Sequence, residues 1–154
     1  MKVFLEEARE ELKRADHLIY VSLKYTRTVD VIKSVIDRLI SCLDFVIDKL
    51  LDHAIDKKLI SEKPANIGLK SNALKKAYGE RFAEVVSLYL HLRKISRAEY
   101  KKSSEYRRHV TMTATTDNGV FMIDIDKSKE LYFQVKQFVE DAEKFIGGEE
   151  EEEK

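Results

Sequence analysis

Cysteine, proline, glycine and tryptophan are scarce in this chain of 154 residues, which has one, one, five and none of them respectively. The single cysteine, Cys42, excludes an internal disulfide bond and is typical of proteins from a reducing compartment. Because apolar residues surround Cys42 in a helical pattern, we expect a packed thiol rather than a nucleophile. Asparagine and glutamine are also rare, whereas charged residues make up 36% of the chain. This balance indicates a heat-adapted source.

Long apolar segments are missing as well. No run of 18 apolar residues occurs, and the short apolar start leads directly into Glu6 and Glu7. A transmembrane helix needs about 20 apolar residues, and a signal peptide needs its own apolar segment. We therefore expect a cytoplasmic protein that makes no membrane contact.

The signature motifs of common enzymes are absent too. The four histidines occur without HExxH or Glu-x-x-His spacing, so zinc and di-iron sites lack their usual ligands. The glycine-rich and serine motifs GxxxxGK[ST], GxGxxG and GxSxG are also missing. We therefore expect no metal and no cofactor.

The strongest positive signal is a stretch at residues 29–58, where apolar residues recur every three or four positions without glycine or proline. This spacing predicts one long amphipathic helix. Thr28 is placed to cap its start, and Asp30 suits the positive end of the helix dipole. A helix of about 30 residues is ~45 Å long and cannot bury its own apolar face. It therefore needs two or three partner helices.

The same periodicity predicts three further helices. The first covers residues 3–25, and the third begins at Ser71 or Asn72 after a loop at 61–68 that holds the only proline. Gly79 inside the third helix indicates a kink. The fourth begins at Asp126 or Ser128, and Gly147-Gly148 is expected to stop it.

A change to alternating apolar and threonine residues predicts a β-hairpin at about 109–125. Val110, Met112 and Ala114 alternate with threonines before Asn118-Gly119. Asn-Gly favours a type I′ turn, which needs positive φ at both positions. Because a lone hairpin is marginally stable in water, it should pack on the helices or extend a sheet across a dimer.

Together these elements predict a mainly α fold, an up-and-down four-helix bundle with a β-hairpin inserted before the last helix. Residues 1–147 form the single domain. The glutamate-rich residues 148–154 form a disordered acidic tail, because like charges repel one another.

Charge is distributed unevenly although the net charge is zero. Residues 56–109 carry 14 Lys and Arg against 6 Asp and Glu, whereas residues 110–154 carry 5 against 12. A basic middle region suggests an acidic partner such as RNA. The acidic tail at Glu149–Glu153 is expected to fold back on this basic region and compete with an acidic ligand.

The best candidate for binding is the basic, aromatic-containing stretch that follows His91. Clustered cations neutralise phosphates, and interleaved aromatics stack on bases. A basic solvated surface, or an internal partner for acidic residues, is the alternative. The candidate nucleic-acid-binding residues are Arg93, Lys94, Arg97, Lys101, Lys102, Tyr106, Arg107 and Arg108.

Two polar clusters stand out elsewhere. Asp16, His17 and Tyr20 lie near the middle of the first predicted helix. Adjacent helical positions point about 100° apart, so Asp16 and His17 do not form a simple dyad, and a structural polar contact is the alternative to an acid/base role. The row Asp44, Asp48, Asp52 and Asp56 forms a carboxylate face that suits either Mg²⁺ or basic side chains from another segment.

The stretches Ala15–Val21 and Glu105–Val110, each followed by the elements predicted above, resemble a group of small archaeal helical proteins of unassigned function. That group is similar to the HEPN superfamily of four-helix bundles. The resemblance implies a dimer and a role near RNA, as an RNA-cleaving toxin or a partner of minimal nucleotidyltransferases. Catalytic members share an Arg followed by a His after four to six residues, and no His in this chain has an Arg at that distance. This departure argues against ribonuclease activity.

Three functions follow. The first is a non-catalytic, dimeric HEPN-like module that binds RNA or a protein partner. The second is an RNA-cleaving or nucleotide-handling enzyme in which Arg108 stabilises phosphate charge and His109 moves protons. The third is a purely structural helical interaction protein.

Overall fold

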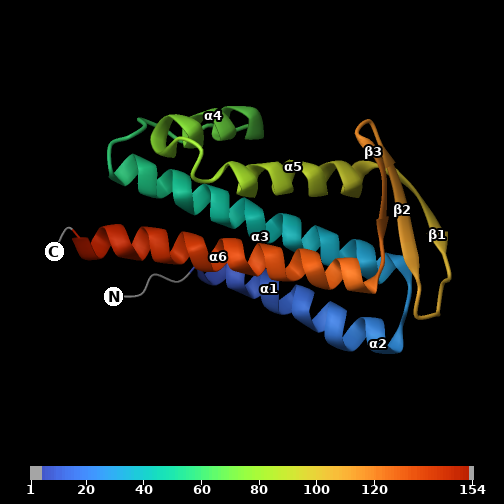
Figure 1. Cartoon of the computed structure of the whole chain (residues 1–154). Helices are drawn as coiled ribbons and strands as arrows, with labels where there is room; N and C mark the ends of the chain where they lie inside the picture. Colours follow the sequence, from blue (N-terminus) through green and yellow to red (C-terminus); the bar gives the residue numbers. More distant parts are fainter. Residues whose placement is uncertain (1–4, 153–154) are drawn as a thin grey trace.

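The structure is mainly helical, with a small antiparallel sheet before the last helix, as the sequence predicts at this level. The computed structural model describes the backbone of residues 5–152 and the side chains of residues 5–148. Long helices lie side by side, and the sheet covers one end of them (Figure 1). None of the helices in the described part of the chain combines the length and the apolar surface needed to cross a lipid bilayer.

The long helix α3 (Val29–Asp56) lies at the centre and confirms the strongest prediction. It begins at Thr28, whose hydroxyl accepts a hydrogen bond from the N–H of Val31. Its apolar face is buried along its whole length, and α1, α5 and α6 all pack against it. Cys42 is fully buried in this face, as expected. Burial, followed by the charge of Glu11, raises the pKa of its thiol to about 12, so the thiol is not a nucleophile.

The first helical segment consists of three consecutive elements: α1 (Glu6–His17), the π-helical turn η1 (Leu18–Ser22) and α2 (Leu23–Tyr25). A buried carboxylate ties its start to the last helix, α6 (Ile125–Glu152). Glu143 accepts hydrogen bonds from the N–H of Leu5 (2.9 Å) and from Nε of Arg9 (2.9 Å). The Glu143 carboxylate, first through its hydrogen bond, raises the pKa of Arg9. These contacts fix the far end of α6 against α1.

The third predicted helix is two helices, α4 (Ile67–Tyr78) and α5 (Ala83–Arg97). Helix α4 begins four or five residues earlier than expected, because Asn66 Oδ1 accepts the N–H of Leu69 at 2.8 Å and caps it. Gly79 has φ +64°, so it ends α4 rather than kinking a continuous helix. The chain then reverses, and α4 lies over α5 (Figure 1).

The predicted hairpin is part of a three-stranded antiparallel sheet in the order β1 (Glu99–Ser103), β2 (Thr111–Thr116), β3 (Gly119–Ile123). Strand β1 lies inside the stretch expected to be a basic surface segment. The β2–β3 turn also differs from the expected type I′ turn. Only Gly119 has positive φ there, at +131°, and Asn118 does not.

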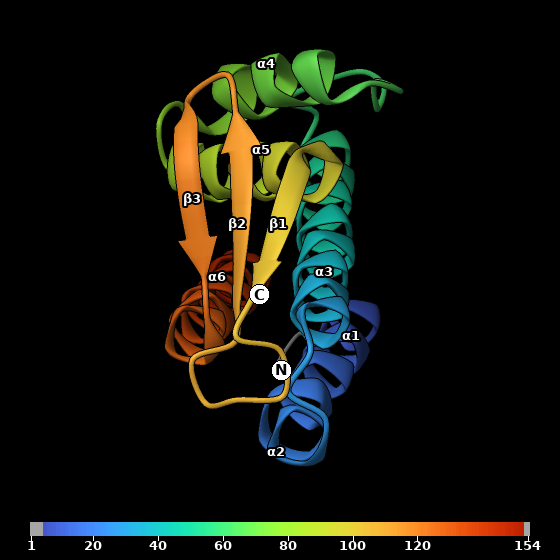
Figure 2. The ribbon, with the colours of Figure 1, turned by 90° about the vertical axis from the view of Figure 1, so that its right-hand side faces the viewer.

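The pairing of the strands shows which side chains lie on each face of the sheet. Met112 opposes Ile123, and Ala114 opposes Phe121, with these side chains turned toward the helices. The outer face carries Lys101, Thr113, Thr115, and the exposed side chains of Val120 and Met122. Figure 2 views this outer face, with the β1–β2 loop at one edge near α2.

Helix α6 is capped by Asp124, whose Oδ1 accepts the N–H of Lys127 at 2.8 Å, rather than by Asp126 or Ser128. It does not stop at Gly147-Gly148, since the helical backbone continues to Glu152. It runs away from the sheet (Figure 1), and its 28 residues span about 40 Å. The backbone of residues 148–152 therefore continues the helix and leads away from the basic segment. The expected disorder at 153–154 lies outside the described residues.

Candidate nucleic-acid interface

The loop that joins β1 to β2 is held by two long-range hydrogen bonds, and it carries the basic residues at the end of the candidate segment. The Glu105 carboxylate accepts the backbone N–H of Val29 at 3.1 Å, so it sits at the N-terminus of α3. The N–H of Tyr106 donates to the carbonyl of Arg27 at 2.6 Å. These two bonds fix the loop to the start of the central helix.

Backbone strain accompanies this anchoring. Ser104 and Tyr106 have φ of 54° and 67°, a region that costs non-glycine residues about 1 kcal/mol or more. The Tyr106 side chain is 76% exposed although its backbone is tightly held. An aromatic ring presented to solvent in a fixed backbone conformation suits stacking on a flat ligand group.

The basic segment is divided by β1 into two groups. The first lies at the end of α5, where the Arg93 guanidinium packs over the ring of Tyr89 at 5.5 Å and Lys94 pairs with Asp117 at 3.4 Å. The second follows β1 and contains Arg107 and Arg108, which lie in the loop between β1 and β2. Five strand residues separate the two groups by about 17 Å.

Internal ion pairs engage some of the candidate cations. Lys102 forms ion pairs with Asp30 at 3.1 Å and with Glu105 at 3.9 Å, and its pKa is raised by the hydrogen bond to Asp30 first and by the charge of Asp30 second. Arg93 and Lys94 are also engaged, as described above. Within residues 5–148, four exposed candidates have no acidic partner: Arg97, Lys101, Arg107 and Arg108. We call these four cations with Tyr106 the basic stripe.

The weak catalytic candidates, Arg108 and His109, are adjacent in the open loop. Both side chains are exposed. The described contact of His109 is through its backbone carbonyl, which accepts the hydroxyl of Thr111 at 2.7 Å. Among the described residues, no group of three metal-binding side chains occurs.

His91, one turn before Arg93, is not part of the exposed surface. Its ring packs edge-on against Phe121 of β3, with 4.5 Å between the ring centroids. Burial lowers the pKa of His91, and the positive charges of Lys127 and Lys94 lower it further. It is a packing residue between α5 and the sheet.

The expected Asp16, His17 and Tyr20 cluster is split by the helix. Asp16 and Tyr20 lie toward α6, where their charges contribute to the raised pKa of Tyr132 after burial, and Lys129 lies 5.5 Å from the Tyr20 ring. His17 instead lines a groove on the side of α3.

Three of the four aspartates in the row on α3 contact side chains from other segments. Asp44 accepts the hydroxyl of Tyr89, Asp48 pairs with Lys70 at 2.8 Å, and Asp52 pairs with Lys63 at 3.1 Å. These contacts support the interpretation that the row pairs with basic side chains from another segment.

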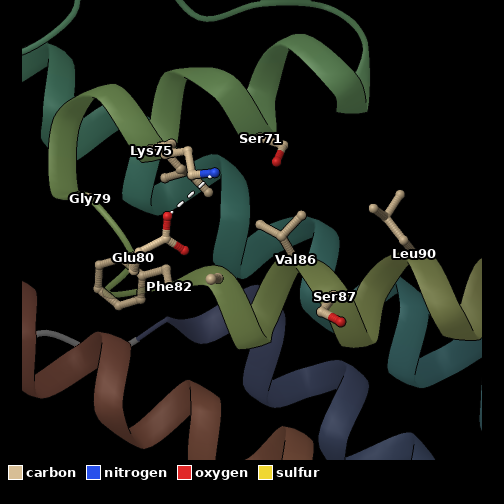
Figure 3. A pocket seen from close by; sticks show the side chains of 10 residues that line it. Ser71, Lys75, Gly79, Glu80, Phe82, Val86, Ser87 and Leu90 are labelled. Carbon is tan, nitrogen blue, oxygen red and sulfur yellow. Dashed lines mark ion pairs between the residues drawn. The ribbon is translucent and has the colours of Figure 1, made fainter.

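An apolar cavity of about 270 Å³ lies between α4 and α5 (Figure 3). Leu74, Val86 and Leu90 supply much of its surface. Lys75 and Glu80 form an ion pair with each other at 3.3 Å at its edge. Both side chains are largely exposed, so this pair is a weak surface one.

A second concave site was not expected from the sequence. Four basic residues from two helices gather there: Lys13, Arg14 and His17 from α1, and Arg38 from α3. The spacing of Lys13, Arg14 and His17 on one helical face was a local signal. The contribution of Arg38 depends on how α1 and α3 pack, which the sequence does not show.

Comparisons of the chain with family models, with curated proteins and with solved structures find no match.

Proposed function

We propose that the protein is a non-catalytic, HEPN-like four-helix bundle that dimerises and binds single-stranded RNA through the basic stripe. One observation carries the RNA-binding part. The β1–β2 loop is fixed to α3 by Glu105 and to Arg27 by the N–H of Tyr106, yet its cations Arg107 and Arg108 have no acidic partner among the side chains of residues 5–148. Unpaired cations on a rigid support attract phosphates without losing much conformational freedom on binding.

Single-stranded RNA fits better than a duplex. The loop offers one exposed aromatic ring, Tyr106, and stacking needs bases that are free of a helix. The threonine-rich outer face has no aromatic platform, because Tyr100 and Phe121 belong to the inward-facing positions of the sheet. Affinity would therefore depend mainly on phosphate contacts and little on sequence.

A second copy of this chain is the occupant proposed for the edge of β3. Strand β1 protects its own edge with Lys101 and Lys102, whereas β3 carries no charge from Gly119 to Ile123. Val120 and Met122 on β3 are 61% and 65% exposed. Uncharged edges that expose apolar side chains invite strand pairing, and two identical β3 edges can pair antiparallel about a two-fold axis.

RNA retention by purified protein tests the RNA-binding proposal. The variant Arg107→Gln/Arg108→Gln should lose most retention of a labelled single-stranded RNA pool. Lys49→Gln/Lys144→Gln is a matched control, because it removes the same charge at exposed positions on α3 and α6 distant from the loop. Equal retention by both variants would rule out the stripe as the interface.

The same assay distinguishes the alternatives. If the protein is an enzyme, wild type should shorten the RNA, and His109→Ala should abolish cleavage while binding persists. If it is a structural module, RNA should be retained by neither wild type nor variants. Intact RNA that is retained by wild type and released by the stripe variant supports the non-catalytic binding module.

A further inference from the structure

The groove between α1 and α3 has a geometry suited to an anion and lies apart from the basic stripe. Its volume is about 470 Å³, and its lining comprises Lys13, Arg14, His17, Leu18, Ser34 and Arg38. Arg38 is nine residues along α3 from Val29, which places it about 13 Å from the loop anchor. The groove therefore forms a second basic site.

A buried carboxylate organises the two arginines. Glu11, whose side chain is only 7% exposed, contacts Nη1 of Arg14 at 2.5 Å through Oε1 and Nη1 of Arg38 at 3.2 Å through Oε2. Each guanidinium has five N–H groups, and these contacts engage one nitrogen of each. The carboxylate thus holds two guanidinium groups from different helices beside one another, with donors left for a ligand.

The groove keeps a net positive charge after the contacts of Glu11 are counted. Lys13 lies close to Glu10 at 3.4 Å, but both side chains are largely exposed, and such surface pairs are weak. Arg14, Arg38 and Lys13 therefore outnumber the one buried carboxylate. The Ser34 hydroxyl donates to the carbonyl of Asp30 at 3.0 Å, so its proton is not available to an anion.

The position of His17 gives a separate indication of function. Helix α1 ends at His17, and the π-helical turn η1 begins at the next residue. Such turns are rare and occur often at functional sites. Here the π-helical turn directly follows His17, whose imidazole lines the groove.

We infer that this groove binds a phosphoryl group. Two guanidinium forks with an ammonium group match the several oxygens of a phosphate better than the two of a carboxylate. The volume exceeds that of one phosphate, so the rest of the phosphate-bearing molecule has room. The phosphoryl group belongs either to a small phosphorylated metabolite or to an RNA chain, and the two sources are separable by experiment.

Titration of full-length protein with adenosine 5′-monophosphate, inorganic phosphate and adenosine tests this site. The Nε–H signals of Arg14 and Arg38 in a ¹H–¹⁵N spectrum report directly on the groove. Adenosine 5′-monophosphate and phosphate should shift both signals at millimolar concentration, and adenosine should shift neither. An oligoribonucleotide that shifts them when the two small ligands do not would assign the phosphoryl group to RNA. Signals unmoved by all of these probes would overturn the inference.

Variants separate binding from folding. Lys13→Gln/His17→Gln leaves Glu11 and both of its arginine partners in place, and it should weaken the ligand that shifts the signals at least tenfold. Arg38→Lys keeps a positive charge for Glu11 but removes one guanidinium fork, and it should also weaken binding of that ligand. Unchanged affinity in both variants would contradict the site.

The basic-stripe variant Arg107→Gln/Arg108→Gln keeps the two proposals independent. It should leave phosphate or monophosphate binding in the groove unchanged while RNA retention falls. If the stripe variant loses small-ligand binding and the groove variant does not, the groove assignment is wrong even where the RNA proposal holds.

Discussion

The carboxylate of Glu105 accepts a hydrogen bond from the backbone N–H of Val29, with 3.1 Å between oxygen and nitrogen. The contact joins the β1–β2 loop to the first residue of α3 across 76 positions of sequence. It places a negative charge at the positive end of the longest apolar helix, and it sets the position of the neighbouring Tyr106, Arg107 and Arg108. Stability and the candidate interface therefore depend on the same side chain.

Replacing Glu105 should lower both the stability of the protein and its affinity for RNA. Glu105→Ala is expected to lower the free energy of unfolding by about 1 kcal/mol, because the helix loses a capping partner. RNA affinity should also fall, since the loop is no longer held. Glu105→Gln, which keeps an acceptor oxygen, should show smaller effects. Chemical denaturation and RNA titration measure them, with the exposed Glu99→Ala as a control expected to change little.

Glu143 is expected to be the most sensitive acidic residue for stability. It is buried and accepts the N–H of Leu5 and the guanidinium of Arg9. Glu143→Ala leaves these donors without their partner and should cost about 2–3 kcal/mol in urea unfolding. Glu130→Ala on the same helix removes only an exposed pair with Lys127 and should cost less than about 0.5 kcal/mol. Similar costs for the two would show that the Glu143 contacts do not hold α6 to α1.

His91 should make stability depend on pH in the acid range. Burial lowers its pKa in the folded protein relative to the ordinary value of 6.5, so the unfolded chain takes up the proton first as pH falls. Stability attributable to His91 is therefore complete above about pH 6.5 and declines below it.

Urea midpoints at pH 7.5 and 5.5 measure this decline, and it should be smaller in His91→Gln. Lys127→Gln should raise the pKa of His91 followed by NMR, because the charge of Lys127 contributes to the lowering. An identical pH response in wild type and His91→Gln would contradict this account.

The edge of β3 gives a prediction about oligomeric state. Sedimentation of wild type should indicate a species of twice 18.0 kDa. Val120→Lys/Met122→Lys places two charges on the exposed face of this edge strand and should give a folded monomer. Leu69→Lys, at an exposed apolar position on α4, is the control and should remain dimeric. A wild-type monomer, or a dimer in all three proteins, would exclude pairing through β3.

Particular residues show which parts of the fold were predictable from sequence. The apolar periodicity of residues 29–58 and the Thr28 cap are local signals, and both predicted α3 correctly. Strand β1 was missed because Glu99-Tyr100-Lys101-Lys102-Ser103 has little apolar alternation, and its pairing with β2 supplies the missing stabilisation. The break at Gly79 was located, but only the positive φ shows that it ends a helix.

The candidate site was likewise predictable from the sequence only in part. The basic segment was visible as composition, whereas the neutralisation of Lys94 by Asp117 and of Lys102 by Asp30 depends on contacts between distant residues. The groove around Glu11 depends on the packing of α1 against α3 and could not be read from either helix alone. Long-range contacts, rather than local patterns, decide which charges are free.

The dependence of RNA affinity on salt is the most direct test of the central claim. A single-stranded ligand that contacts the four cations Arg97, Lys101, Arg107 and Arg108 should give a slope of about −2.8 for log K against log salt concentration. Arg107→Gln/Arg108→Gln should reduce this to about −1.4, because two phosphate contacts are lost. Lys49→Gln/Lys144→Gln should keep the wild-type slope. Equal slopes for wild type and the Arg107/Arg108 variant would contradict an RNA interface at the basic stripe.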